Sequence, residues 1–474
     1  MMTPPDLTAL RALVTGPVLQ HGEPGWAEEI MGFNLAIVQQ PAIAVGATCA
    51  DDVAHAIRFA GEHGLTVSVQ ATGHGAAIPA DGGVLINTAR MSDVHIDPVA
   101  RTARVAAGAR WQQVVDAAAP HGLAPLNGSS LTVGVVGYTL GGGMGPMART
   151  FGLAADHVTR LRLVTADGAA RDVTADSDPE LFWALRGGKC AVGIVIELEF
   201  ALMPVPTYYG GAIYFPGAAA SDVLHAWRDW TQTLPEQATS SIALLRLPDL
   251  PEVPEPLRGV LSAHLRYVYV GDPERGAELL APMRAAARPL VDFVAETPYP
   301  AIGSVHNDPT EAMPVWDGSC LLSSLSGEAI DALLGAAGPD VDVPLILAEI
   351  RQLGGAIARQ PAAPNAVGGR DAPFGAYVVG PLPPPLAEAT PAAGRAVLDA
   401  LAPWSTGTTM INFQGAASGA DAVGKAWPDQ TRARLRAVKE RHDPAGRFRF
   451  AYSLDPVEPD SAEPPQSLQL DGTA

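Results

Sequence analysis

Along the first half of the chain, two kinds of segment follow one another: short runs that are β-branched or alternate between apolar and polar residues, and stretches in which apolar residues recur at helical spacing. The alternating runs predict strands at 34–39, 41–45, 66–70, 84–87, 94–96, 102–106, 161–165, 171–174 and 196–202. Helical spacing bounded by acidic starts and Pro or Gly stops predicts helices over 51–64, over 111–119 and from Pro179 to the double glycine at 187–188. A strand, a helix and a strand therefore lead into a glycine-rich loop at 71–76.

The second half is less regular, and the pattern breaks at Met203-Pro204-Val205-Pro206, where we place a domain boundary. Strands are predicted at 211–215, 242–247, 261–270, 345–353 and 376–379, with helices over 219–230, 276–286 and 431–441. Pro-rich breaks at 248–256 and 381–385 are expected to be surface loops. Antiparallel sheet backed by helices is the natural architecture for the region after the boundary.

Composition limits the partners of the protein. A chain of 474 residues is too long for one compact core, so two domains are expected. The net charge of −19 opposes binding to nucleic acid. The cysteines Cys49, Cys190 and Cys320 lie far apart, which indicates neither a disulfide framework nor a metal site, and Cys190 is interpreted as a small buried residue. No apolar run could span a bilayer and the N-terminus lacks a signal peptide, so we expect a cytoplasmic protein without a membrane partner.

The loop after the strand at 66–70 is a candidate phosphate site. Every residue after Gln70 is small except His74, which Gly73 and Gly75 bracket. A turn with so little side-chain bulk lets backbone N–H groups converge into a nest that holds phosphate oxygens. The same glycines leave the imidazole of His74 accessible to a ligand lying on the backbone.

A second glycine cluster contains three consecutive glycines, 141–143. Ordering them is costly, so we expect the main chain to approach a flat ligand or another backbone closely. Residues 143–148 also satisfy the dinucleotide fingerprint G-x-G-x-x-G/A, although Gly152 would break the helix that this fingerprint requires. A nicotinamide-dependent dehydrogenase therefore remains an alternative.

Several of these segments resemble one family. The loop 70–75, the segments 132–134, 137–138, 141–143 and 152–158, and above all Glu180-Leu181-Phe182-Trp183-Ala184-Leu185-Arg186-Gly187-Gly188 are similar to the FAD-linked oxidases of the vanillyl-alcohol oxidase/p-cresol methylhydroxylase (PCMH) superfamily, closest to the berberine-bridge-enzyme-like branch. The resemblance implies a two-domain α+β fold of the PCMH type. It divides the chain into an FAD-binding domain at 1–204, a substrate domain at 205–425, a return to the FAD-binding domain at 426–454 and a disordered tail at 455–474.

The resemblance also implies how the cofactor is held. His74 takes the place of the histidine that the family bonds to the 8α-methyl of the flavin, whereas Ser130 stands where bicovalent members have a second, cysteine attachment. Gln70 replaces the family's usual arginine, which removes one charge partner for the phosphates. The implied cofactor contacts are Gln70, Ala71, Thr72, Gly73, His74, Gly75, Ala76, Ser130, Thr132, Val133, Gly134, Gly137, Gly141, Gly142, Gly188, Val195 and Asn412.

The substrate side departs from the family pattern. Met410 replaces the tyrosine that often serves as catalytic base in the Tyr-x-Asn-Phe strand, and methionine cannot take a proton. Tyr138 and Tyr377 are the remaining candidate bases, and either would need a pKa lowered from about 10. Val367, Gly369 and Ala191 also replace larger or more polar family residues, which indicates a pocket rebuilt for a larger, more apolar substrate or a loss of catalysis.

The resemblance implies an FAD-linked oxidoreductase, and specifically an oxidase. It would take a hydride from an alcohol or an activated C–H bond of a small organic substrate, and oxygen would reoxidise the flavin to give hydrogen peroxide. The cofactor carries that chemistry, while the protein supplies position and a base. A flavin-containing protein that sequesters an aromatic compound without turnover is the second alternative.

Overall fold

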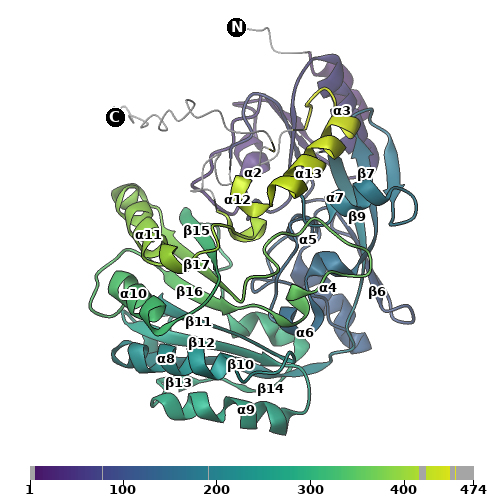
Figure 1. The fold of residues 1–474 in the computed structure, drawn as a ribbon. Coiled ribbons are helices and arrows are strands. Elements are labelled where there is room, and N and C mark those ends of the chain that lie inside the picture. Colours follow the sequence, from purple (N-terminus) through teal and green to yellow (C-terminus); the bar gives the residue numbers. More distant parts are fainter. Residues whose placement is uncertain (1–5, 77, 190–191, 416–422, 449–453, 455–474) are drawn as a thin grey trace.

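The computed structural model describes residues 6–76, 78–189, 192–415, 423–448 and 454. Two smaller sheets lie beside a larger third sheet, and helices cover all three (Figure 1). The tail expected at 455–474 and the predictions for Cys190 and Ala191 fall outside the described residues. Within the described ranges, no helix has the length and apolar character needed to cross a membrane.

The first sheet comes from the N-terminal part of the chain and is mostly parallel. Its strand order is β1 (Val18–Leu19), β2 (Ile43–Gly46), β4 (Val84–Asn87) and β3 (Val67–Gln70), with β1 antiparallel to β2. Helix α3 (Ala50–Glu62) links β2 to β3 and buries Val53, Ala56, Ile57 and Ala60, the spacing that predicted it. The short helices α1 (Thr8–Leu13) and α2 (Trp26–Ile30) complete this layer. Strand β3 ends at the glycine-rich loop.

The second sheet is antiparallel throughout. Its order is β5 (Val94–Asp97), β6 (Thr102–Ala106), β9 (Gly193–Ala201), β7 (Val158–Thr165) and β8 (Ala170–Val173). The helices of this region are α4 (Trp111–Ala118), α5 (Val135–Leu140), α6 (Ala148–Phe151) and α7 (Pro179–Leu185). From the C-terminal part, α12 (Val423–Ala426) leads into α13 (Asp429–His442), which packs against α7 with Leu435 and Val438 buried (Figure 1).

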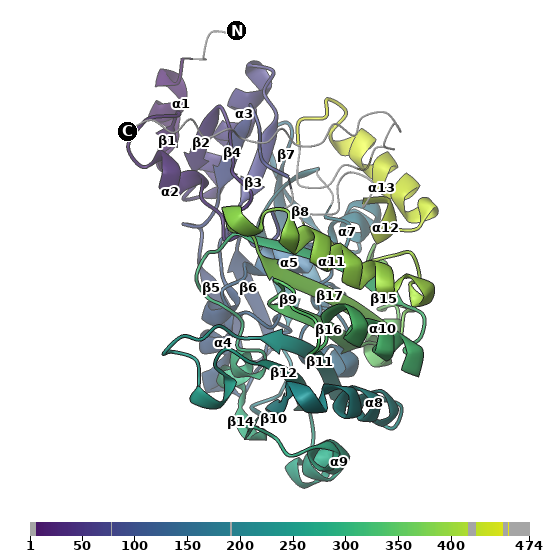
Figure 2. The ribbon, with the colours of Figure 1, turned by 90° about the vertical axis from the view of Figure 1, so that its left-hand side faces the viewer.

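The third sheet contains the strands β13 (Val291–Asp292), β10 (Thr207–Pro216), β12 (Leu261–Tyr269), β11 (Ala238–Arg246), β16 (Leu347–Gln352), β17 (Phe374–Pro381) and β15 (Val315–Leu322), in this order, and β14 (Ala295–Pro298) pairs with β10. Its neighbouring strands are antiparallel. The helices α8 (Ala220–Thr231), α9 (Pro273–Ala286), α10 (Gly327–Ala337) and α11 (Ala389–Ala400) complete this part. Figure 2 shows α8, α10 and α11 along the outer side of the sheet.

Alternation along these strands gives the two faces of the third sheet different chemistry. Ile350 and Ala376 point into the apolar core beneath the helices. Their neighbours Glu349, Arg351 and Tyr377 point to the opposite face, as a side-chain period of two requires. The polar face of this sheet therefore lies towards the two N-terminal sheets and not towards solvent.

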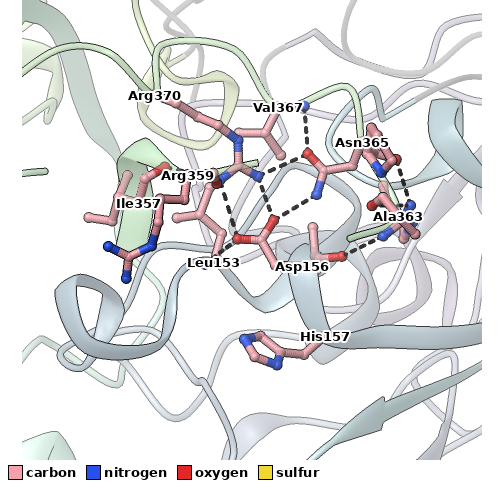
Figure 3. Close-up of polar contacts among 12 residues, drawn as sticks. Leu153, Asp156, His157, Ile357, Arg359, Ala363, Asn365, Val367 and Arg370 are labelled. Atoms are coloured by element: carbon pink, nitrogen blue, oxygen red, sulfur yellow. Dashed lines mark hydrogen bonds and ion pairs between the residues drawn. The ribbon is translucent and has the colours of Figure 1, made fainter. Parts of the chain in front are cut away.

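A buried ion pair ties the segment before β17 to the first part of the chain. The Nη2 atom of Arg370 lies 2.5 Å from Oδ1 of Asp156, and both side chains are almost fully buried (Figure 3). Asn365 donates from Nδ2 to the same carboxylate at 2.7 Å and accepts from Arg370 at 2.9 Å. This junction holds the segment 357–370 in place, so that Val367 packs over Gly142 and Gly187.

The structure confirms the predicted α+β fold and differs from the sequence predictions in places. Residues 34–39 form no strand, because Oδ1 of Asn34 accepts from the backbone of Ala36 and Val315 and fixes the segment as a turn. Residues 411–413 form a single 3₁₀ turn where a strand was expected from the family. Elements that the pattern did not predict include β15, α10 and α11. Helix α6 spans four residues and follows a turn, which opposes a dinucleotide fingerprint at 143–148.

Candidate functional site

A cleft of about 1100 Å³ lies between the N-terminal sheets and the polar face of the third sheet. Its lining includes the loop 70–76, the segment 128–138 and residues of β9 from the first part of the chain. From the third sheet come Asp317, Glu349, Arg351 and Tyr377. The cleft thus joins a glycine-rich end to a charged end, which is the arrangement expected for a cofactor beside a substrate.

The glycine-rich end begins where β3 stops. Gln70 is buried and turns its amide nitrogen towards the carbonyl oxygens of Ile30 and Met31, at 3.3 and 3.0 Å. Gly73 has φ +73°, and a Cβ there would collide with the backbone of Gly32, so only glycine fits this turn. Among the described residues, none accepts a hydrogen bond from the backbone N–H of Gly73, His74 or Gly75. These N–H groups are therefore open to an anionic ligand, which fits the phosphates of FAD.

The imidazole of His74 is held by three neighbours. Nδ1 lies 2.9 Å from Oγ1 of Thr72, Nε2 lies 3.2 Å from Oγ1 of Thr132, and the ring stacks on Phe33 with 3.8 Å between centroids. Burial, with a smaller effect of the nearby Arg110 charge, lowers the pKa of His74 to about 4. The ring is therefore neutral at physiological pH and keeps one nitrogen lone pair.

Ser130 belongs to the same group. Its hydroxyl lies 2.9 Å from Oγ1 of Thr132, so two hydroxyl contacts lead from His74 to Ser130. The residue that the resemblance placed opposite the histidine is thus close to it across the cleft, and it is a hydroxyl where a thiolate would be required for a second attachment.

Most of the predicted cofactor contacts line the cleft. They are Gln70, Ala71, Thr72, Gly73, His74, Gly75, Ala76, Ser130, Val133, Gly134, Gly137, Gly188, Val195 and Asn412. Thr132 lies behind His74 and Ser130 and reaches the site through its hydroxyl.

Gly141 and Gly142 do not line the cleft. A Cβ on Gly141 would collide with Oδ1 of Asn412 and would lie 2.5 Å from Cε of Lys189, while Gly142 packs against Val367 at 3.2 Å. The glycine cluster thus makes room for side chains from three distant segments, and contact of Gly141 and Gly142 with the cofactor stays a prediction. Lys189 also lines the cleft, and the sequence analysis did not identify it as a site residue. The signal in the sequence was a charged residue directly after the double glycine 187–188.

The charged end of the cleft contains a buried group that the sequence pattern did not reveal. Glu349 accepts from Arg266 at 2.6 Å and from Arg351 at 2.9 Å; Glu349 and Arg266 are nearly inaccessible, whereas Arg351 is partly exposed. Burial disfavours every charge here, but Arg351 and Arg266 outweigh it and hold the pKa of Glu349 below its usual value. Arg351 also lies over the ring of Phe413, 4.9 Å from its centroid.

Tyr138 is not suited to be the proton acceptor. Its ring packs edge-on against Trp111 and closely against Gly143, and no described residue bonds its hydroxyl. Burial raises the pKa of this phenol far above 10, with only a small opposing effect from Arg351. A base would need the opposite shift, so the surroundings of Tyr138 do not favour this role.

Tyr377 lies at the charged end, but it too has the wrong pKa for a base. Its hydroxyl donates to Oδ2 of Asp317 at 2.9 Å, and its ring meets Phe413 edge-on. Burial, followed by the charge of Asp317, raises the pKa of Tyr377 well above its ordinary value. The group in this pair that can accept a proton is the carboxylate of Asp317, which sequence reasoning did not identify.

Comparison with known proteins identifies an FAD binding domain in the first part of the chain. Residues 41–174 match the FAD binding domain model. The (R)-6-hydroxynicotine oxidase of Paenarthrobacter nicotinovorans is 37% identical over 171 residues, which are 36% of this chain and 37% of the relative. An uncharacterized FAD-linked oxidoreductase of Bacillus subtilis, YvdP, is 27% identical over 94% of this chain and 98% of its own.

Solved structures agree on the fold. The BBE-like 1 protein of Physcomitrella patens superposes with a TM-score of 0.82 at 20% identity, covering 95% of this chain and 99% of the other. The glucooligosaccharide oxidase of Acremonium strictum, described with a 6-S-cysteinyl, 8α-N1-histidyl FAD, gives a TM-score of 0.80 at 20% identity over 95% of this chain and 100% of the other.

The fold and the cleft thus define a two-domain PCMH-type protein whose cofactor is FAD. The chain contains an FAD binding domain, and it is similar to proteins named FAD-linked oxidoreductases and oxidases. Three observations support FAD as the ligand of the cleft: the volume of the cleft, the open N–H groups beside His74, and the small residues of the loop 70–76.

Proposed function

We propose that this protein is an FAD-dependent oxidase that takes a hydride from an alcohol or another activated C–H bond of a small organic substrate and uses oxygen as its electron acceptor. The observation that supports it most is the Tyr377–Asp317 pair, which lies in the same cleft as the His74 loop. A cleft that only stored flavin would not need a proton acceptor beside it.

His74 is proposed to bond the flavin, and to be the single attachment. The stack on Phe33 and the contacts with Thr72 and Thr132 fix the orientation of its ring. Its lowered pKa keeps the imidazole neutral, which is the form that can act as a nucleophile. The Ser130 hydroxyl is a much weaker nucleophile than a cysteine thiolate, so a second bond is not expected.

Bound FAD would accept the hydride and pass the electrons to oxygen, giving hydrogen peroxide. The protein's part is to accept the proton that leaves the substrate hydroxyl or amine. Tyr377 is neutral, so it can take a proton at its hydroxyl only while it delivers its own proton to Oδ2 of Asp317. Arg351, which faces both Tyr377 and Asp308, supplies a fixed positive charge near this pair.

The substrate side of the cleft combines these charges with apolar positions. Met313, Val315, Ile346, Val379 and Phe413 line it together with Asp308 and Asp317. An aromatic or aliphatic substrate that carries one hydroxyl or amine group matches this lining better than an oligosaccharide, which needs many hydrogen-bonding partners.

The experiment is anaerobic reduction of the purified flavoprotein by alcohols, amines, phenols and sugars, followed by air and a peroxide assay. With a substrate in hand, Asp317→Asn should lower kcat by roughly 10²–10⁴-fold. The matched control is Tyr208→Phe, which removes a buried hydroxyl outside the cleft and should leave kcat unchanged. A flavin that none of these compounds reduces would favour the binding protein, and unchanged turnover in Asp317→Asn would remove this pair from the reaction.

A further inference from the structure

Lys189 reaches across the cleft towards the loop that carries His74. Its backbone N–H is fixed by the carbonyl oxygen of Leu140 at 3.1 Å, at the end of α5. The side chain then passes Gly141, and Nζ stops 3.5 Å from the position that a Cβ on Gly75 would occupy. The ammonium group therefore lies beside the open N–H groups of the loop.

The backbone at Lys189 makes this placement costly. Its φ is +42°, a left-handed conformation that glycine adopts freely and that side chains with a Cβ adopt at some cost. Two glycines, Gly187 and Gly188, precede it in a turn where glycine would be the less strained choice. A lysine retained in that conformation indicates a role for its charge.

Among the described residues, three other Lys or Arg side chains line the cleft. The lining cations Arg266 and Arg351 contact Glu349, and Lys439 contacts Asp443 at 3.0 Å. Gln70, at the start of the loop, is uncharged and faces Ile30 and Met31. Lys189 also lines the cleft, and its Nζ lies at the loop, where a positive charge favours the binding of a group with two negative charges.

We propose that Lys189 is the cationic partner of the FAD diphosphate in this protein. The oxidised isoalloxazine ring is neutral, whereas the diphosphate carries two negative charges and belongs where the N–H groups of Gly73 to Gly75 converge. Burial lowers the pKa of Lys189 to about 8, so the ammonium form still predominates at neutral pH and is weakly hydrated, which favours contact with an anion.

The test measures flavin binding by fluorescence quenching in a His74→Ala background, where binding is reversible, so it does not depend on turnover. Lys189→Met should weaken FAD binding roughly tenfold to a hundredfold, the range for a hydrogen bond to a charged group, and change riboflavin binding by less than about twofold. Lys189→Arg should restore most of the affinity. Lys425→Met, which removes an exposed lysine outside the cleft, is the matched control and should change neither affinity.

Two further readouts separate this role from a structural one. Lys189→Gly should leave the apoprotein as stable as the parent or more stable, because glycine relieves the left-handed backbone, while FAD binding still weakens. FAD affinity of the parent should fall as pH rises through about 8, and Lys189→Met should lose that dependence. Equal losses for FAD and riboflavin, unchanged FAD binding, or a destabilised Lys189→Gly apoprotein would each overturn the proposal.

Discussion

Replacing Asp156 with alanine removes the anion of the buried pair that joins the segment 357–370 to the first part of the chain. Four hydrogen bonds end on this carboxylate: two from Arg370 at 2.5 and 3.2 Å, one from Asn365 at 2.7 Å and one from the N–H of Leu153 at 2.9 Å. In the variant Arg370 keeps only neutral acceptors, among them the carbonyl oxygens of Ile357 and Arg359.

The magnitude follows from the burial of both partners, which are 6% and 7% exposed. Breaking a buried pair by removing one charge costs about 3–5 kcal/mol, because the other charge stays in a medium that solvates it poorly. The lost bonds to Asn365 and Leu153 are part of that cost and are not added to it. For a unit of a few hundred residues this corresponds to a fall in Tm of roughly 6–20 °C.

Urea and thermal unfolding of the apoprotein measure this effect, and flavin release measures its consequence at the cleft. The control is Glu236→Ala, which removes the exposed pair with Arg359 at 2.7 Å and should cost about 0–1 kcal/mol. The double variant Asp156→Ala/Arg370→Met should recover part of the loss, since no uncompensated charge remains. If Asp156→Ala is as stable as Glu236→Ala, the junction does not hold the two parts together as argued.

The remaining predictions concern the His74 loop. His74→Ala should abolish flavin fluorescence of the denatured protein on a gel, whereas Ser130→Ala should retain it; the opposite result would refute single attachment through histidine. Gly73→Ala should lower the unfolding temperature and FAD occupancy, because its Cβ meets Gly32; full occupancy at unchanged stability would contradict the geometry. Between pH about 4 and 6.5 the unfolded state binds a proton that folded His74 does not, so stability should rise with pH. His74→Ala should reduce this pH dependence of the stability. A urea midpoint that varies with pH in the variant as it does in the parent would contradict the prediction.

Much of the first part of this protein follows from sequence alone. Strand β4 and helix α3 are encoded by local apolar periodicity, and the loop at His74 by a run of small residues whose backbone demands are local. The FAD-binding segments are contiguous stretches that match a family model, so the cofactor could be inferred without knowing which strands lie together.

The charged end of the cleft depended on tertiary structure. Asp317 and Tyr377 lie on strands joined by antiparallel pairing across sixty residues. Glu349 contacts Arg351 of its own strand β16 and Arg266 of β12, which β11 separates from β16 in the same sheet. A pKa depends on burial and on the charges within a few ångströms, and neither is visible in one strand's pattern. For this reason Tyr377, which the sequence suggested as a base, stays protonated in the folded protein. The loop that Lys189 approaches can likewise be identified only from the tertiary structure.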